Sequence, residues 1–151
     1  MLPSPDKQKM ELTALLDGAL SIMAPLFKKA NVTLTNTVEV KRWLMADPQQ
    51  MEQVLINLFI NSIYALEDKE YKHITIGAEV KSNRIFINIT DTGNGIDKEI
   101  EDKIFLPFFT TRKEGAGIGL TLSKNIVEAP GGYLSYSTTD SSTTFIICLI
   151  T

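Results

Sequence analysis

A long helix whose surface is almost entirely apolar constrains this fold more than any other segment of the chain. The helix is expected to begin at Asp47-Pro48 and to run to about Glu67, because aspartate caps free backbone N–H groups and proline suits the first helical position. A surface helix usually has a wide polar face. Here most polar residues fall in one stripe about 80° wide on a helical wheel: Gln50, Gln53, Asn57, Asn61, Tyr64 and Asp68. We therefore expect burial on nearly all other sides of this helix.

The order of the other predicted elements indicates the fold class. Helical spacing recurs from Leu12 to Phe27, and further helices are expected near 97–105 and over 118–129. Alternation of apolar and polar residues predicts strands over 32–35, 41–46, 74–80, 85–90, 133–137 and 143–150. Since these strands come mostly in hairpins, we expect an α+β two-layer sandwich, with a mixed sheet of about five strands and helices on one face. A doubly wound parallel sheet is the less favoured alternative.

Length, charge and hydropathy exclude several functional classes. The 151 residues fit one domain, which is expected over 11–151 after a disordered polar tail over 1–10. The net charge of -3 provides no overall basic field, so no nucleic-acid partner is expected. No apolar run reaches the roughly 18 residues of a membrane span, so this domain is expected to make no membrane contact. The single cysteine, Cys148, fits a buried strand residue in a reducing, cytoplasmic compartment.

Two asparagines stand one turn apart in the polar stripe of the long helix. Asn57 and Asn61 are unusual there because asparagine has a low helix propensity. An asparagine carbonyl can coordinate Mg²⁺ without adding charge, and phosphates and waters then complete the octahedron. The stripe is therefore interpreted either as a polar ligand site or as the ordinary solvent-exposed face of the helix.

A first glycine-rich loop follows the strand over 85–90. Its sequence is Asp91-Thr92-Gly93-Asn94-Gly95, and two glycines at this spacing allow a positive φ and close approach of a ligand to the backbone. An aspartate at the strand end could accept a hydrogen bond from an amine such as that of adenine. The same pattern also occurs in ordinary turns. It is not a dinucleotide fingerprint, because Lys98 stands where the third glycine would fall.

A second glycine-rich loop leads directly into the helix over 118–129. Gly115, Gly117 and Gly119 leave backbone N–H groups free next to a helix N-terminus, which suits phosphate binding. Arg112 and Lys113 lie just upstream and could reach a terminal phosphate. The alternative is a flexible linker that caps a helix. No Gly-Lys-Ser/Thr follows, so the segment is not a Walker A loop.

The order of these motifs resembles the catalytic domain of sensor histidine kinases. The asparagine helix, Asp-x-Gly-x-Gly, Phe-x-Pro-Phe-Phe from Phe105, and Gly-x-Gly-x-Gly-Leu from Gly115 are similar to its N, G1, F and G2 boxes. That domain belongs to the superfamily shared with gyrase, Hsp90 and MutL. The resemblance covers about residues 11–150, implies a Bergerat-type sandwich, and is greatest to the nitrogen-regulator type through the sequence Phe108-Phe109-Thr110-Thr111.

The resemblance implies roles for individual residues. Asn61 would bind Mg²⁺, Asp91 would hold the adenine amine, and the catalytic residues would be Asn57, Arg112 and Lys113. Tyr64 stands where many members have a phosphate-contacting lysine. Contacts to ATP would come from Asn57, Asn61, Tyr64, Asp91, Gly93, Gly95, Ile96, Phe105, Phe109, Thr110, Thr111, Gly115, Gly117, Ile118, Gly119 and Leu120.

The resemblance also implies a function that this chain cannot complete alone. Family members transfer the γ-phosphate of ATP to a histidine on a two-helix dimerisation domain, and then serve a response regulator. The one histidine here, His73, stands at the start of a strand, which is a poor place for a phosphoacceptor. We therefore expect an ATP- and Mg²⁺-binding histidine kinase module, monomeric without its dimerisation domain, from a parent protein that is cytoplasmic or membrane-anchored.

Three other functions remain open from the sequence. They are an autonomous ATPase of the gyrase or Hsp90 kind, an anti-sigma-type serine kinase, and an interaction module that no longer transfers phosphate. The serine kinases typically use a glutamate one turn before the Mg²⁺ asparagine as a general base. That position here is Asn57, which cannot take a proton, so histidine phosphorylation is favoured. The presence of Asn61, Asp91 and the glycines disfavours an inactive module.

Overall fold

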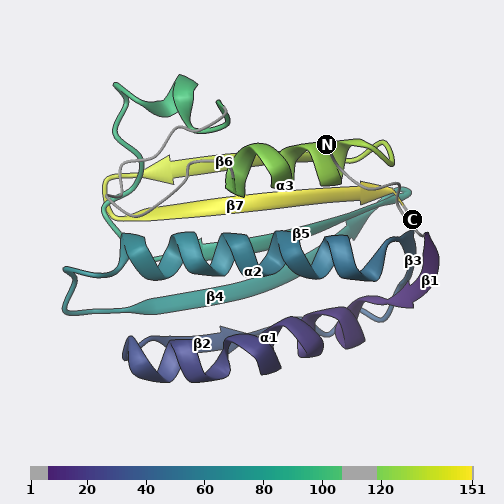
Figure 1. Cartoon of the computed structure of the whole chain (residues 1–151), viewed down its shortest axis with the longest axis horizontal. Helices are drawn as coiled ribbons and strands as arrows, with labels where there is room; N and C mark the ends of the chain where they lie inside the picture. The colour runs from purple at the N-terminus through teal and green to yellow at the C-terminus, as the bar shows by residue number, and fades with distance from the viewer. Residues whose placement is uncertain (1–6, 107–118, 151) are drawn as a thin grey trace.

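The structure is a computed structural model that describes residues 7–106 and 119–150. It has two layers, with helices over one face of a sheet (Figure 1). The helices are α1 (Leu12–Lys29), α2 (Pro48–Ala65) and α3 (Gly119–Glu128). The strands of the sheet, in spatial order, are β2 (Thr33–Asn36), β4 (His73–Lys81), β5 (Arg84–Asp91), β7 (Ser142–Ile150) and β6 (Tyr133–Thr139). The predicted α+β class, with a mixed five-stranded sheet, is confirmed.

The sheet is built from two local hairpins and one edge strand. Strands β4 and β5 form one antiparallel hairpin and β6 and β7 the other, and the two hairpins join through the antiparallel pairing of β5 with β7. Strand β2 runs parallel to β4 at the edge. Along β5 the side chains alternate, so Ile85, Ile87 and Ile89 are buried under the helices. Asp91 follows in the same alternation and therefore also faces the helical layer.

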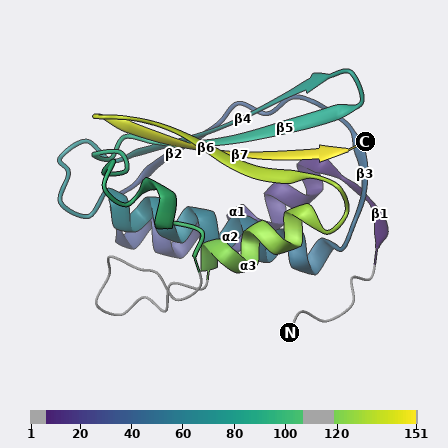
Figure 2. The ribbon, with the colours of Figure 1, turned by 90° about the horizontal axis from the view of Figure 1, so that it is seen from above.

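Helix α2 lies in the middle of the helical layer, between α1 and α3 (Figures 1 and 2). It begins as predicted, because the Asp47 carboxylate accepts hydrogen bonds from the N–H groups of Gln49 and Gln50 at 2.9 and 3.2 Å. The Phe59 ring meets that of Phe27 in α1 edge-on, with 5.6 Å between centroids. The side toward the sheet is buried and consists of Met51, Val54, Leu55, Leu58, Phe59 and Ser62. Three further apolar residues are only half-buried: Ile56, Ile60 and Ile63.

The N-terminal segment differs from the expected disordered tail over 1–10. Gln8–Glu11 forms strand β1, which pairs antiparallel with β3 (Trp43–Ala46) in a separate two-stranded sheet. The tail prediction is therefore wrong for residues 8–10, because backbone hydrogen bonds to β3 and burial of the Met10 side chain hold this segment in place. Residues 1–6 lie outside the described residues.

The helix expected near 97–105 is also different in the structure. Only Glu101–Lys103 forms a short 3-10 turn, labelled η1. The N–H groups of Ile100, Lys103 and Leu106 each donate to a carbonyl three residues earlier. Such bonds close tighter rings than the α-helical ones and rarely continue for long. The segment instead turns so that Ile104 is buried in the core.

Packing of α2 predicts a clear difference between its two faces. Leu55→Ala is expected to lower the free energy of unfolding by about 3 kcal/mol, because Leu55 is fully buried and its truncation leaves a cavity. The exposed Gln53 on the same helix serves as the control, and Gln53→Ala should change stability by less than about 0.5 kcal/mol. Urea denaturation measures both values, and a loss below about 1 kcal/mol for Leu55→Ala would contradict the packing described.

Candidate functional site

A buried carboxylate marks the candidate site at the end of β5. The Asp91 side chain is only 2% exposed, and its Oδ1 accepts a hydrogen bond from the backbone N–H of Gly93 at 2.9 Å. Burial raises the pKa of Asp91 above its ordinary value, and the hydrogen bond from Gly93 and the nearby Ser62 hydroxyl offset part of this rise. A buried carboxylate with so few protein partners is suited to accept hydrogen bonds from a ligand.

Two buried hydroxyl residues lie beside Asp91 and were not singled out from the sequence. Ser62 of α2 is 1% exposed, and among the described residues its hydroxyl has no hydrogen-bond partner of normal geometry, although it lies near the Asp91 carboxyl group. Thr143 of β7 stands directly opposite Asp91 in the sheet and is 4% exposed. The available signal was the position of Ser62 on the apolar side of the helical wheel. A buried hydroxyl without a partner indicates a place for water or a ligand.

In the first glycine loop, the predicted positive φ is found at Gly95, and both glycines lie close to the backbone of neighbouring elements. A side chain at Gly93 would lie 2.9 Å from the carbonyl oxygen of Ala65, so this part of the loop packs directly on the C-terminal end of α2. Gly95 has a φ of 79°, and a side chain there would lie 1.8 Å from the carbonyl oxygen of Thr139. Any other residue would meet both strain and a clash at this position. The loop therefore lies pressed between α2 and the β6–β7 turn.

Two side-chain hydrogen bonds hold the same loop from outside. The Lys69 ammonium, in the connection after α2, donates to Asn94 Oδ1 at 2.6 Å. On the opposite side, the N–H of Ile96 donates to the Thr138 hydroxyl at 2.8 Å. Ile96, a predicted ATP contact, is therefore attached to β6. Neither Lys69 nor Thr138 was singled out from the sequence, since only the fold brings them to the loop.

Helix α2, on which the first glycine loop packs, also carries the predicted polar stripe. Asn57 and Asn61 are both half-buried, and Tyr64 is 42% exposed. The amide nitrogen of Asn61 donates to the carbonyl oxygen of Asn57 at 2.8 Å. This bond uses the nitrogen and not the carbonyl oxygen of Asn61, which is the atom suited to Mg²⁺. Within the described residues no cluster of three or more His, Cys, Asp or Glu side chains could hold a metal ion.

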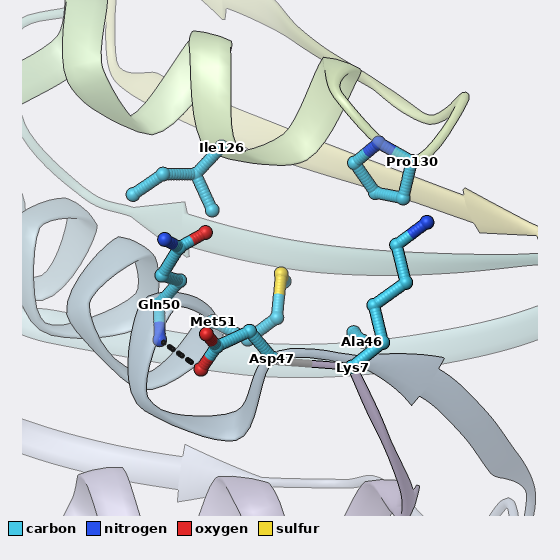
Figure 3. Close-up of a pocket in the computed structure, with 7 residues that line it drawn as sticks. All are labelled: Lys7, Ala46, Asp47, Gln50, Met51, Ile126 and Pro130. Atoms are coloured by element: carbon cyan, nitrogen blue, oxygen red, sulfur yellow. Dashed lines mark hydrogen bonds between the residues drawn. The ribbon is translucent and has the colours of Figure 1, made fainter. Parts of the chain in front are cut away.

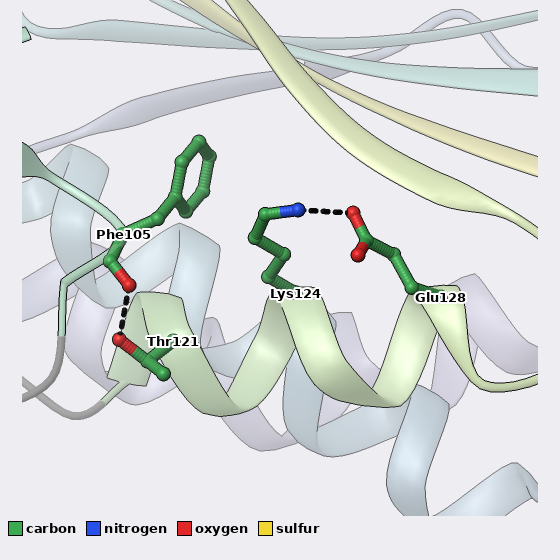
Figure 4. A network of polar contacts seen from close by, with 4 residues as sticks. All are labelled: Phe105, Thr121, Lys124 and Glu128. Atoms are coloured by element: carbon green, nitrogen blue, oxygen red, sulfur yellow. Dashed lines mark hydrogen bonds and ion pairs between the residues drawn. The ribbon is translucent and has the colours of Figure 1, made fainter. Parts of the chain in front are cut away.

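Phe105 connects the end of the η1 segment to α3. Its ring lies 6.1 Å from that of Tyr136, and the Lys124 ammonium lies 5.8 Å from its centre. The Thr121 hydroxyl donates to the Phe105 carbonyl, and Lys124 forms an ion pair with Glu128 (Figure 4). Gly119 begins α3, and Leu120 packs against the core. The described ends of the F and G2 boxes are therefore held together.

Several predicted site residues fall outside the described part of the chain. These are the two catalytic candidates Arg112 and Lys113 and the predicted ATP contacts Phe109, Thr110, Thr111, Gly115, Gly117 and Ile118. Their roles stay predictions. The remaining predicted residues lie on α2, on the loop after β5, and at Phe105 and the start of α3.

A small hollow lies at the opposite end of α2 from Asp91. There the Asp47 carboxylate accepts from the N–H of Gln50 (Figure 3). Gly93 packs on Ala65, the last residue of this 18-residue helix. At a rise of 1.5 Å per residue, the hollow and the glycine loop after Asp91 are therefore about 25 Å apart along α2. The hollow is thus separate from the candidate site, and it is lined by Lys7, Ala46, Asp47, Gln50, Met51, Ile126 and Pro130.

Comparison with known families supports the interpretation of the four motifs. Residues 46–150, which include α2 and both glycine loops, match the family described as histidine kinase-, DNA gyrase B- and HSP90-like ATPases. The chain belongs to this ATPase family. Its members bind ATP, so the general prediction of a nucleotide-binding domain is confirmed. Assignment to the nitrogen-regulator type stays a prediction.

The relatives of this ATPase domain include sensor histidine kinases. The chain is 33% identical over 129 residues to the sensor histidine kinase ZraS of Salmonella typhimurium, and the match covers 83% of this chain. It covers only 27% of ZraS, so the chain spans about a quarter of that relative's length.

Solved structures of histidine kinases have the same fold. The nucleotide-free catalytic domain of histidine kinase ThkA superposes with a TM-score of 0.86 at 27% identity, over 96% of this chain and 95% of that one. ThkA in complex with the response regulator protein TrrA gives a TM-score of 0.82 at 26% identity, over 97% of this chain and 42% of that one. None of the helices in the described part of the present ATPase domain is long and apolar enough to cross a membrane.

The raised pKa of Asp91 predicts how stability depends on pH. The folded chain holds this proton more tightly than the unfolded chain, so ionising Asp91 costs the folded state stability as pH rises from about 4 to the raised pKa. Asp91→Asn lacks this titration. The free energy of unfolding of the wild type, relative to Asp91→Asn, should therefore fall with rising pH through that window and then level off. Urea denaturation at a series of pH values tests this, and a difference that is constant or rises would contradict it.

Proposed function

We propose that this chain is the ATP- and Mg²⁺-binding catalytic module of a sensor histidine kinase. Residues 11–151 form the module, and β1 (Gln8–Glu11) leads into them and pairs with β3. It transfers the γ-phosphate of ATP to a histidine on a dimerisation domain that is absent from this chain. The observation that carries the proposal is the buried Asp91 carboxylate, which stands at the end of β5 against a glycine loop that packs on α2.

Asp91 is proposed to accept a hydrogen bond from the adenine amine. The carboxylate is desolvated and accepts a hydrogen bond from the backbone N–H of Gly93. The buried Ser62 hydroxyl beside it has no hydrogen-bond partner of normal geometry in the described part of the chain, which fits a ligand or an ordered water that reaches both groups. An amine donor would satisfy the carboxylate and offset part of the cost of burying it.

The polar stripe of α2 and the second glycine loop are proposed to hold the phosphates. Asn61 supplies one uncharged oxygen for Mg²⁺, while the nucleotide phosphates and water supply the others, as is usual for this ion. When bound, Mg²⁺ would neutralise charge that develops on the phosphates, and Arg112 and Lys113, which precede the second glycine loop in the sequence, are proposed to assist it. Asn57 cannot act as a base, so this module positions ATP and any base comes from the partner domain.

The phosphoacceptor is proposed to lie on the dimerisation domain of the same parent protein. His73 of this chain is a poor candidate because both ring nitrogens contact hydroxyl groups. Its Nε2 lies 2.8 Å from Thr35 Oγ1, and its Nδ1 lies 3.2 Å from the Tyr71 hydroxyl. We further propose that a response regulator receives the phosphate, as the complex of ThkA with TrrA suggests, and that the isolated module is a cytoplasmic monomer without nucleic-acid or membrane contacts.

Removal of the Asp91 carboxylate is expected to weaken ATP binding by a factor of about 10 to 100. A charge-assisted hydrogen bond contributes about 1.5–3 kcal/mol, and Asp91→Ala deletes it. Calorimetric titration with ATP and Mg²⁺ measures the change, and the exposed Asp17 of α1 provides the control variant Asp17→Ala. Unchanged affinity in Asp91→Ala would refute the adenine contact. Absence of binding by the wild type would favour an interaction module.

Asn61→Ala is expected to act on the metal and not on the adenine. ATP affinity without Mg²⁺ should stay within about twofold of the wild type, while the gain in affinity on adding Mg²⁺ should largely disappear. Titrations with ATP in the presence of a chelator and of excess Mg²⁺ compare the two conditions. Gln53→Ala, two turns earlier in the same stripe, should keep the full effect of Mg²⁺. An unchanged response to Mg²⁺ in Asn61→Ala would rule out Asn61 as a ligand.

A further inference from the structure

The Thr138 hydroxyl makes several contacts that are separate from the backbone pairing of its strand. It accepts a hydrogen bond from the N–H of Ile96 at 2.8 Å, and it lies 3.2 Å from the Thr143 hydroxyl. It also lies 3.3 Å from the carbonyl oxygen of Ser142, to which it can donate. A hydroxyl group has one proton to donate and two lone pairs to accept. All three are used when Ile96 and Thr143 donate and Ser142 accepts.

These contacts join the glycine loop to the strand beside Asp91. Thr138 pairs with Thr143 across the β6–β7 hairpin, and Thr143 stands opposite Asp91 in the pairing of β7 with β5. The C-terminal ends of strands β5 and β6 lie at the same end of the sheet, where β7 begins (Figure 1). One side chain therefore connects the backbone after Gly95 with the buried strand position that faces the Asp91 carboxylate.

The loop needs a fixed position on this side because its backbone lies directly on the hairpin. Gly95 is so close to the carbonyl oxygen of Thr139 that it has no room for a side chain. On the other side Lys69 holds the loop through Asn94, but that bond is exposed, so water competes for both groups. The bond from Ile96 to Thr138 is partly buried and is therefore the stronger of the two attachments.

We propose that Thr138 is a positioning residue of the nucleotide site, which fixes the loop from Gly93 to Ile96 at the distance from Asp91 that adenine requires. This inference rests on the proposed function. Thr138 does not itself need to touch the nucleotide. Its contribution is to hold the loop in the binding geometry before the ligand arrives, so that less conformational entropy is lost on binding.

Replacement of Thr138 by valine tests this, because valine keeps the branched shape and removes only the hydroxyl. In the full chain, Thr138→Val is expected to weaken ATP binding about tenfold in calorimetry. The Ile96 amide should also exchange with solvent about tenfold faster in the absence of nucleotide. Thr138→Ser restores the hydroxyl, so both values should return to within about twofold of the wild type.

Thr144 provides a matched control in the same sheet. Its hydroxyl pairs with that of Thr90 at 2.8 Å, and its side chain alternates with Thr143 and so points away from the helices. Thr144→Val removes a comparable bond and should leave ATP affinity and exchange at Ile96 within about twofold of the wild type. If Thr144→Val lost the same ATP affinity, the effect of Thr138→Val would come from lower stability of the sheet and not from the position of the loop. That result would overturn the proposal.

The two measurements separate this inference from the proposed function. Weaker ATP binding together with faster exchange at Ile96 supports the positioning role, and an unchanged value of either one in Thr138→Val overturns it. If the wild type bound no ATP, the proposed function would fall. Exchange at Ile96 in Thr138→Val would then still decide whether this hydroxyl holds the loop.

Discussion

The burial of α2 between two helices and a sheet is the constraint on which the rest of the structure depends. Apolar burial fixes the rotation of this helix about its axis, because turning it would expose fully buried residues such as Leu55 and Leu58. Consecutive residues differ by about 100° around a helix. Asn61 therefore points along the polar stripe while Ser62 points toward the sheet and Asp91. One rigid element thus contributes to both the phosphate and the adenine parts of the proposed site.

The candidate site carries an energetic cost that a purely structural position would avoid. Burial raises the pKa of Asp91, and the Ser62 hydroxyl beside it has no hydrogen-bond partner of normal geometry among residues 7–106 and 119–150. Unsatisfied polar groups inside a domain usually indicate a functional constraint, because a nonpolar pair of similar size would be more stable. The glycine loop beside Asp91 also has a backbone conformation that most residues could not adopt. Gly95 accepts a positive φ and close contact with Thr139, so the loop can lie directly on the β6–β7 hairpin.

Much of the fold could be predicted from the sequence because its strands come in local hairpins. The hairpin of the strands predicted over 74–80 and 85–90 and the helix start at Asp47-Pro48 depend on residues close together in the chain, and both agree with the structure. The predictions for the tail and the segment over 97–105 do not. Strand β1 forms by pairing with Trp43–Ala46, which follows more than thirty residues later, and no local pattern of apolar residues specifies such a partner.

By itself, the sequence determined most of the elements and the family, and it singled out candidate site residues. A capping aspartate, a narrow polar stripe and glycine spacing act within a few residues, so Asn61, Asp91 and Gly95 could be singled out directly. Only the tertiary structure decided which residues surround Asp91. Ser62, Thr143 and Thr138 look like ordinary helix and strand residues, and they reach the site through helix rotation and strand register. Both depend on contacts between distant segments, because burial of the whole core and not local propensity selects them.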